Sequence, residues 1–344
     1  MSIITAPPTY LPSDRATALS SGRRPSFAHR LPAGCVHKTS AAEVLLTDAV
    51  RTGDDRFTVG AAWFRDRFLH HGGDGRSPDP LLLAETVRQT LIHLSHRFHG
   101  APQGHPFVLD RLDLELAPDA PPLRPGAPAH VTLDVTCART VTTPRRAGLA
   151  LEATASVDGV LIGRAGIRWE VLHPAFYQVV RHRAARPRTA GAPEHPAAPT
   201  GPLRRLAPGE VGYPGDEHVL LARDSSGTRG GFWLDPDPGH PVLFDHPSDH
   251  VPGMILLEAF RQAGRAMGAP LHPAGLSATF TAFAEPDLPV AVTVTPGPEV
   301  VGRSDGTARW RPARRRTAVV TAAQRGVVLA AARLAYPADR QETS

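Results

Sequence analysis

Apolar residues follow two kinds of pattern along the chain, and each pattern predicts a different element. Residues 80–98 and 252–267 are long apolar segments, and the first is apolar on nearly every side, which predicts helices buried inside the protein. Residues 130–136 ("HVTLDVT") and 289–295 ("PVAVTVT") alternate apolar and polar positions, which predicts strands with one buried face. A buried helix beside several antiparallel strands indicates the α+β class, with the sheet wrapped around the helix.

Turn residues separate these elements in the same order in each half of the chain. A strand pair comes first, joined through "RTGDD" (51–55) in one half and "RDSSGTRGG" (223–231) in the other. The long helix follows and stops before a Gly-Ala-Pro sequence, at 100–102 and 268–270. The last two strands of each half turn at Asp158-Gly159 and at Arg325-Gly326, which predicts tight hairpins.

The two halves also share residues in the same order. Glu85, Arg88 and Gln89 of the first helix recur with identical spacing in the second, as Glu258, Arg261 and Gln262. Val44, Leu45 and Leu46 recur as Val219, Leu220 and Leu221. Residues 154–169 resemble 321–336. Three blocks in one order at similar offsets indicate an internal duplication.

Composition shifts divide the chain around this duplication. Residues 1–34 are rich in Pro, Ser and Arg without a sustained period, which predicts a mobile N-terminal arm. Residues 182–208 have the Pro, Ala and Arg content of a linker. The predicted repeats are therefore 35–181 and 209–340.

Charge and cysteine content restrict the class of protein. The chain has 344 residues and a formal net charge of +5, but its arginines cluster in segments that read as loops, at 181–188 and 311–316. We therefore predict neither a nucleic-acid partner nor a membrane partner. The two cysteines, Cys35 and Cys137, are too few for a disulfide framework, and no signal peptide or membrane span is evident, so we predict a cytoplasmic location.

Two known families resemble the segments that begin the helices. "HVPGMILLEA" (250–259) is similar to the hydroxyacyl-carrier-protein dehydratases, in which a Pro-Gly step precedes an acid, although His246 departs from their histidine spacing. A closer resemblance is to the A-factor biosynthesis family of gamma-butyrolactone synthases. Three segments carry it: "VHKTSAAEVLLTD" (36–48), "DPLLLAETVRQT" (79–90) and "FDHPSDHVPGMILLEAFRQA" (244–263).

This resemblance implies both a fold and a reaction. The fold is two tandem hot-dog repeats, each a long central helix wrapped by an antiparallel sheet, packed as a pseudo-dimer. The reaction moves a beta-ketoacyl group from acyl carrier protein to the hydroxyl of dihydroxyacetone phosphate, in biosynthesis of a gamma-butyrolactone or butenolide signal. It implies no cofactor beyond the phosphopantetheine of the carrier protein.

The acids and histidines near the two helix starts are candidates for the base that such a transfer needs. Glu85 and Glu258 lie in apolar helices, where burial is expected to raise the pKa of a carboxyl group toward neutrality. The alternative is that each glutamate forms a local ion pair with the arginine three residues later. His246 and His250 are further candidates because histidine titrates near neutral pH.

Other residues suit the binding of substrate. Gly253 at a helix N-terminus lets a thioester carbonyl approach backbone N–H groups. Arg88 and Arg261 suit a phosphate, either of the acceptor or of phosphopantetheine, because the guanidinium matches a pair of anionic oxygens. Four further polar residues near these positions complete the predicted binding set: Asp79, Gln89, Asp249 and Gln262.

Hot-dog sites usually form between two units, so we predict a site that combines Glu85 of the first repeat with His246 of the second. The first half lacks the "DHPSDHVPG" of 245–253, so one of the two possible sites is expected to be silent. His93, His96 and His99 have no carboxylate or cysteine to complete a metal set, and no metal is predicted. A dehydratase, a thioesterase and a non-catalytic acyl-ligand-binding regulator remain alternatives, and the oligomeric state is open.

Overall fold

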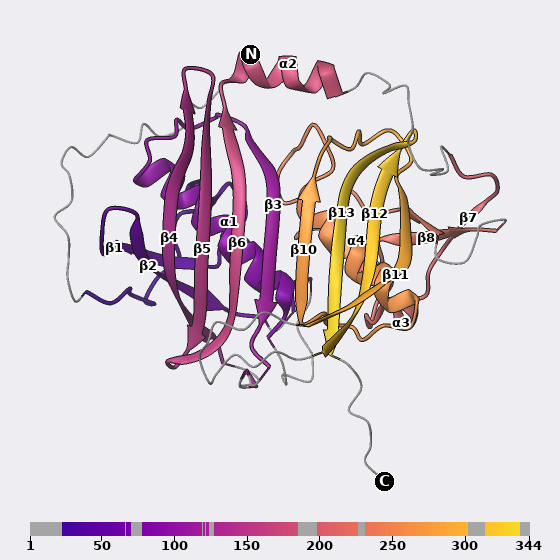
Figure 1. The fold of residues 1–344 in the computed structure, drawn as a ribbon, viewed down its shortest axis with the longest axis horizontal. Coiled ribbons are helices and arrows are strands. Elements are labelled where there is room, and N and C mark those ends of the chain that lie inside the picture. The colour runs from indigo at the N-terminus through magenta and orange to yellow at the C-terminus, as the bar shows by residue number, and fades with distance from the viewer. Residues whose placement is uncertain are drawn as a thin grey trace, which may run out of the picture.

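A single antiparallel sheet runs through both halves of the protein (Figure 1). The computed structural model describes residues 23–65, 67–69, 78–118, 120, 122–123, 127–184, 198–225, 231–301 and 314–337. In the first half the strands lie in the order β1 (Leu46–Arg51), β2 (Arg56–Trp63), β4 (Ala129–Thr143), β5 (Arg146–Val157), β6 (Val160–Leu172) and β3 (Phe107–Leu116). The sheet continues through β10 (Gly275–Phe280), β13 (Val327–Pro337), β12 (Arg314–Gln324), β11 (Ala291–Val301), β9 (Gly231–Leu234), β8 (Leu221–Asp224) and β7 (Leu203–Arg205).

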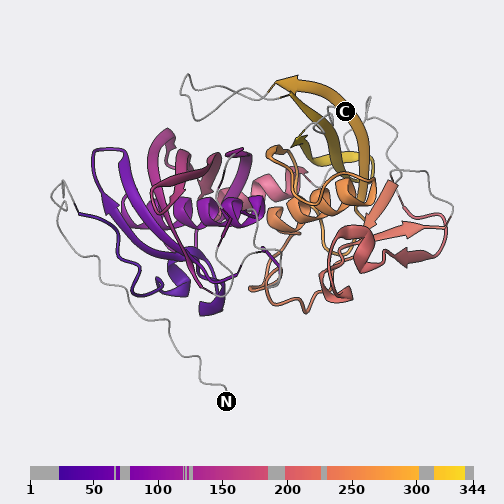
Figure 2. The ribbon, with the colours of Figure 1, turned by 90° about the horizontal axis from the view of Figure 1, so that it is seen from below.

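One long helix packs into each half of this sheet. These are α1 (Pro80–Arg97) and α4 (Gly253–Ala266), which lie roughly in line on the same side of the sheet (Figure 2). The shorter helices are α2 (Pro174–Ala184), α3 (Pro208–Val211) and the 3-10 turns η1 (Ala33–Val36), η2 (Ala41–Glu43) and η3 (Asp216–His218). The predicted α+β arrangement of two repeats, each a helix wrapped by an antiparallel sheet, is confirmed.

Local sequence explains where the long helices begin. The Asp79 side chain accepts a hydrogen bond from Leu81 N and caps α1, and Pro80 occupies the first turn, where its missing N–H costs nothing. Inside the helix, Leu81, Leu82 and Leu83 are fully buried although they point in different directions, because strands and loops enclose α1. Both long helices match their predicted ranges to within one residue at each end.

The two predicted hairpin turns are present. Asp158 and Gly159 have φ of 50° and 76°, and Arg325 and Gly326 have φ of 50° and 76°. Left-handed backbone at both central residues matches the right-handed twist of the flanking strands. The duplication therefore extends to backbone conformation.

The two halves are joined by pairing of β3 with β10. Leu112 pairs with Ala278 and Leu114 with Leu276, so edge strands of the two repeats complete each other. Glu115 of β3 also forms an ion pair with Arg315 of β12 at 2.9 Å. The pseudo-dimer is thus held by a continuous sheet.

The predicted boundary segments are described only in part. Residues 1–22 of the predicted arm and 185–197 of the predicted linker lie outside the described residues. Within the predicted linker, Leu203–Arg205 forms β7 and pairs with β8. Residues 181–184 end α2 and 314–316 begin β12, so the described parts of both arginine-rich segments belong to regular elements rather than to loops. No helix in the described ranges is both long and apolar enough to cross a membrane.

Candidate active site

Each central helix carries a Glu, an Arg and a Gln in the same buried network. In α1, Glu85 accepts hydrogen bonds from Arg88 Nε and Nη2, both at 2.8 Å, and from Gln89 Nε2 at 2.9 Å. Gln89 also donates to Glu43 O and accepts from Leu45 N, both at 2.8 Å. The network therefore fixes the helix to the chain that enters β1.

The second repeat reproduces these contacts in α4. Glu258 accepts from Arg261 Nε at 3.0 Å, from Arg261 Nη2 at 2.6 Å and from Gln262 Nε2 at 2.8 Å. Gln262 donates to His218 O at 2.7 Å and accepts from Leu220 N at 2.9 Å. The local ion pair that was the alternative to a catalytic glutamate is thus present in both halves.

The pKa of Glu85 moves opposite to the expectation from sequence. Burial by itself raises the pKa, but the charges of Arg88 and Lys38 and the hydrogen bonds from Arg88 and Gln89 lower it below its ordinary value. Lys38 Nζ lies 3.4 Å from Glu85 Oε1. The expectation that burial brings Glu85 toward neutrality is therefore wrong, because three partners stabilise the carboxylate. A carboxylate held ionised in this way is a weak proton acceptor.

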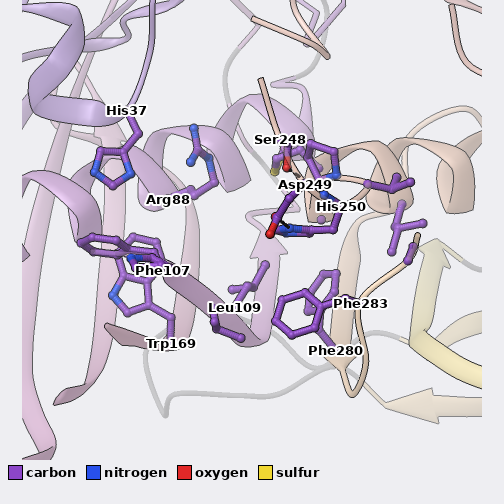
Figure 3. A pocket seen from close by; sticks show the side chains of 18 of the residues that line it. His37, Arg88, Phe107, Leu109, Trp169, Ser248, Asp249, His250, Phe280 and Phe283 are labelled. Atoms are coloured by element: carbon purple, nitrogen blue, oxygen red, sulfur yellow. Dashed lines mark hydrogen bonds and ion pairs between the residues drawn. The ribbon is translucent and has the colours of Figure 1, made fainter. Parts of the chain in front are cut away.

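A cavity of about 560 Å³ lies where the two repeats meet. Figure 3 shows side chains from both halves pointing into it, among them Arg88 of α1 and His250 of the loop before α4. Glu85 and His246 also line this cavity, so the predicted pair from different repeats shares one space. Six of the predicted site residues line it: Glu85, Arg88, His246, Asp249, His250 and Gly253.

Asp249 and His250 form a hydrogen-bonded pair on the cavity wall. His250 Nδ1 lies 2.7 Å from Asp249 Oδ1. A proton on Nδ1 that is donated to the carboxylate leaves Nε2 as an acceptor. Burial raises the pKa of Asp249, but hydrogen bonds from His250 and Tyr177 outweigh this and lower it. The pair therefore has the arrangement of a histidine base oriented by an acid.

Helix α2 of the first repeat holds this pair in place. Tyr177 donates its hydroxyl proton to Asp249, with oxygen distances of 2.8 and 2.9 Å. Arg181 donates to the backbone oxygen of Asp249 at 2.8 Å and makes a bidentate ion pair with Glu285 at 2.9 and 2.8 Å. Side chains of one repeat thus position the candidate base carried by the other.

The matches to known families follow the same division into two halves. The sequence pattern of the A-factor biosynthesis hotdog domain family matches residues 19–173 and again residues 195–336. The chain belongs to this A-factor biosynthesis hotdog family. Both of its repeats are therefore hotdog domains, as the resemblance implied.

Curated relatives and solved structures cover most of the chain. A 2-oxo-3-(phosphooxy)propyl 3-oxoalkanoate synthase of Streptomyces virginiae is 36% identical over 272 residues, covering 78% of this chain and 88% of its own. A synthase of the same name from Streptomyces coelicolor is 31% identical, covering 80% of this chain and 88% of its own. Among solved structures, a 12:0-ACP thioesterase from Umbellularia californica has a TM-score of 0.45 and 11% identity, covering 82% of this chain and 94% of its own.

His37 lines the cavity and is hydrogen-bonded to His96. The sequence predicted neither histidine as a site residue. His37 Nε2 lies 2.8 Å from His96 Nε2, and His96 Nδ1 lies 2.8 Å from Ala101 O. Burial, with the nearby His96 and Arg88, lowers the pKa of His37 to about 3, so its imidazole is neutral at neutral pH. His37 stands in the segment that carries the family resemblance, but nothing in its spacing distinguishes it.

His246 shares this electrostatic environment. Burial lowers its pKa, and the charges of Arg88 and Lys38 lower it further. Its Nδ1 atom is buried, and no residue in the described ranges forms a hydrogen bond with it. The imidazole therefore lies near two cations and also near the Asp245 carboxylate, whose Oδ2 is 3.9 Å from His246 Nδ1.

The opposite wall of the cavity is apolar. Phe107 and Trp169 meet edge to face with centroids 4.9 Å apart, and Leu109, Phe280 and Phe283 extend the wall (Figure 3). These residues come from separate strands and loops, so no sequence spacing could group them. An alkyl chain buried against such a wall gains about 0.8 kcal/mol per methylene.

Gly253 stands where this wall meets the start of α4. A Cβ added there would lie 3.2 Å from Leu109 Cδ2 and 3.2 Å from Phe280 Cε1. The first N–H groups of a helix have no intrahelical acceptor; in α4 the Ile255 and Leu256 N–H groups donate to Pro252 O, which leaves those of Gly253 and Met254 as the candidate donors at the cavity. The site can thus stabilise negative charge on a carbonyl oxygen.

Five predicted site residues lie away from the cavity. Asp79 caps α1 and Gln89 holds the chain before β1, while Glu258, Arg261 and Gln262 form the buried network of α4. Glu258 is 0% exposed and Arg261 is 2% exposed. Within the described ranges, no group of His, Cys, Asp and Glu side chains has the arrangement of a metal site.

Proposed function

We propose that this protein transfers a 3-oxoacyl group from a thioester to the hydroxyl of dihydroxyacetone phosphate. The product is the ester named in the two Streptomyces synthases, a 2-oxo-3-(phosphooxy)propyl 3-oxoalkanoate. The observation that carries the proposal is the composition of the cavity. It combines the His250–Asp249 pair and two cations, Arg88 and Lys38, with an apolar wall that suits an acyl chain.

His250 acts as the base in this proposal. The acceptor hydroxyl donates its proton to His250 Nε2 while Asp249 holds Nδ1–H and stabilises the imidazolium. The resulting oxygen nucleophile attacks the thioester carbonyl, and the N-terminus of α4 at Gly253 stabilises the oxyanion. The C–S bond then breaks, the ester C–O bond is complete, and the thiolate takes the proton from His250.

The remaining cavity residues bind substrate. Arg88 attracts the phosphate, and the aromatic wall takes the acyl chain. Glu85 orients Arg88 and is not itself the base, since its carboxylate is fully engaged. His246 lines the same space and suits a hydrogen bond to the acceptor.

The donor is proposed to arrive on the phosphopantetheine of acyl carrier protein. The two cysteines, Cys35 and Cys137, are free, which suits a reducing cytoplasm where carrier proteins work.

Mass spectrometry of three-component mixtures tests the reaction. Purified protein, a 3-oxoacyl thioester and dihydroxyacetone phosphate are expected to give the ester only when all three are present. Thioester consumption without the acceptor would indicate a thioesterase or a dehydratase. Acyl binding without any turnover would indicate a regulator instead.

The variant His250→Gln tests the assignment of the base. We expect kcat to fall roughly 100- to 10,000-fold, since a positioned general base contributes about that much. His130→Gln is the matched control, because His130 is exposed on β4 outside the cavity. Unchanged turnover in His250→Gln would contradict the role given to this residue.

A further inference from the structure

The duplicated network offers an internal comparison, because the two copies differ in one partner of the glutamate. In the first repeat Lys38 Nζ lies 3.4 Å from Glu85 Oε1. In the second, the Tyr213 hydroxyl donates to Glu258 Oε1 at 2.9 Å. Lys38 lies in the segment before β1, and Tyr213 lies in the corresponding segment before β8. A cation in one copy thus corresponds to a neutral hydroxyl in the other.

The network that contains Tyr213 is buried and does not line the cavity. Tyr213 is 6% exposed, and the guanidinium of Arg261 lies over its ring, 4.8 Å from the centroid. One carboxylate, one guanidinium and one hydroxyl satisfy each other there. Nothing in that network is left to bind an anion.

The copy with lysine opens onto the cavity. Glu85, Arg88 and Lys38 all line it, and two cations there face one carboxylate. The ion pair with Glu85 is the one contact with a carboxylate that the described ranges give to Lys38. An ammonium has three donors, so Lys38 keeps capacity for a further anionic partner.

Each network has one further aspartate nearby, so the difference in charge between the two copies remains. In the first copy, the Asp245 carboxylate interacts electrostatically with Arg88 and Lys38, and it accepts hydrogen bonds from Thr39 N at 2.8 Å and Ser40 N at 2.9 Å. In the second copy, the Asp79 carboxylate interacts electrostatically with Arg261, and it likewise accepts hydrogen bonds from backbone N–H groups, those of Phe68 and Leu81. The net difference between the copies remains one positive charge.

We propose that Lys38, together with Arg88, binds the phosphate group of the acceptor, and that Tyr213 makes the duplicate site unable to do so. This inference rests on the proposed function for the identity of the acceptor. Lys38 is the only lysine in the chain. The two imidazoles of His37 and His246 border the same region, and a bound phosphate would give them an anionic partner.

Kinetics with two acceptors test the role of Lys38. For Lys38→Met we expect the KM for dihydroxyacetone phosphate to rise roughly 10- to 100-fold, as for loss of a hydrogen bond to a charged group. The KM for unphosphorylated dihydroxyacetone and the KM for the thioester are expected to stay unchanged. Lys38→Arg is expected to retain part of the preference for the phosphorylated acceptor.

Tyr213→Phe is the matched control at the equivalent position, and we expect it to leave both acceptor KM values unchanged. Equal increases for both acceptors in Lys38→Met would show a structural role and overturn the inference. So would a loss of phosphate preference in Tyr213→Phe.

Calorimetry with glycerol 3-phosphate separates this inference from the proposed reaction, because it needs no turnover. Binding to the native protein that is lost in Lys38→Met supports the phosphate site even if no ester is formed. Equal binding by both proteins, or no binding by the native protein, overturns it whatever the reaction proves to be.

Discussion

Glu85 and Glu258 lie in two copies of the same network, but only the copy with Glu85 lines the cavity. Each accepts a forked pair of hydrogen bonds from the arginine one turn later. The Arg88 side chain is 18% exposed and faces the cavity, whereas the Arg261 side chain is 2% exposed. The same ion pair can therefore support a ligand in one repeat and only the fold in the other.

Removing the two carboxylate charges is expected to have unequal effects on stability. Glu258→Gln removes the only carboxylate hydrogen-bonded to the buried Arg261 cation in the described ranges and should cost about 3–5 kcal/mol. Glu85→Gln should cost less, because water in the cavity can solvate Arg88 and Lys38. Urea unfolding of both variants measures the difference in free energy of unfolding. An equal or larger loss in Glu85→Gln would contradict this account of the two networks.

At the scale of elements, α2 links the two repeats at the cavity wall. It follows β6 in sequence, yet its residues Tyr177 and Arg181 contact Asp249, which lies in the loop before α4 of the second repeat. The arginine side chain is 13% exposed, and its bidentate partner Glu285 is 34% exposed. The helix therefore lines the cavity and also positions the loop that carries the candidate base.

Loss of this contact is expected to reduce turnover more than stability. In Arg181→Met the loop at 245–252 should exchange amide hydrogens faster, and kcat should fall at least roughly tenfold because His250 loses its fixed position. Hydrogen exchange by mass spectrometry and steady-state kinetics measure both effects. Arg146→Met serves as the control, since it removes an exposed ion pair with Glu170. Unchanged exchange in the loop would show that α2 does not restrain it.

At the scale of the molecule, the repeats share one sheet and one cavity. Separating them would expose the paired edges of β3 and β10 and the facing walls of the cavity. Unfolding of either half thus removes support from the other.

We expect the two halves to unfold in a single transition for this reason. Variants that retain only Trp63 or only Trp233 report on the first and second repeat, respectively, and Trp169 and Trp310 become Phe in both. In each variant, the urea midpoint followed by fluorescence should coincide with the midpoint followed by far-UV circular dichroism of that same variant, because circular dichroism reports on both repeats. Separate midpoints would show that the seam between β3 and β10 is too weak to couple the repeats.

The sequence by itself determined the elements and their repetition, because these depend on local chemistry. Long apolar segments predicted α1 and α4, and Asp158-Gly159 and Arg325-Gly326 predicted tight hairpin turns, which have left-handed backbone in the structure. The recurrence of Glu85 and Arg88 as Glu258 and Arg261 raised the alternative of a local ion pair in each helix, and both ion pairs exist. The motifs at the helix starts also indicated the family.

Only the tertiary structure decided which network lines the cavity and in which direction the pKa of Glu85 moves. Lys38 approaches Glu85 from a distant segment, and its charge helps reverse the shift that burial alone would cause. The aromatic wall and the His37–His96 contact likewise join residues with no common spacing. Solvation, charge and cavity shape depend on neighbours in space, which periodicity along a chain does not encode.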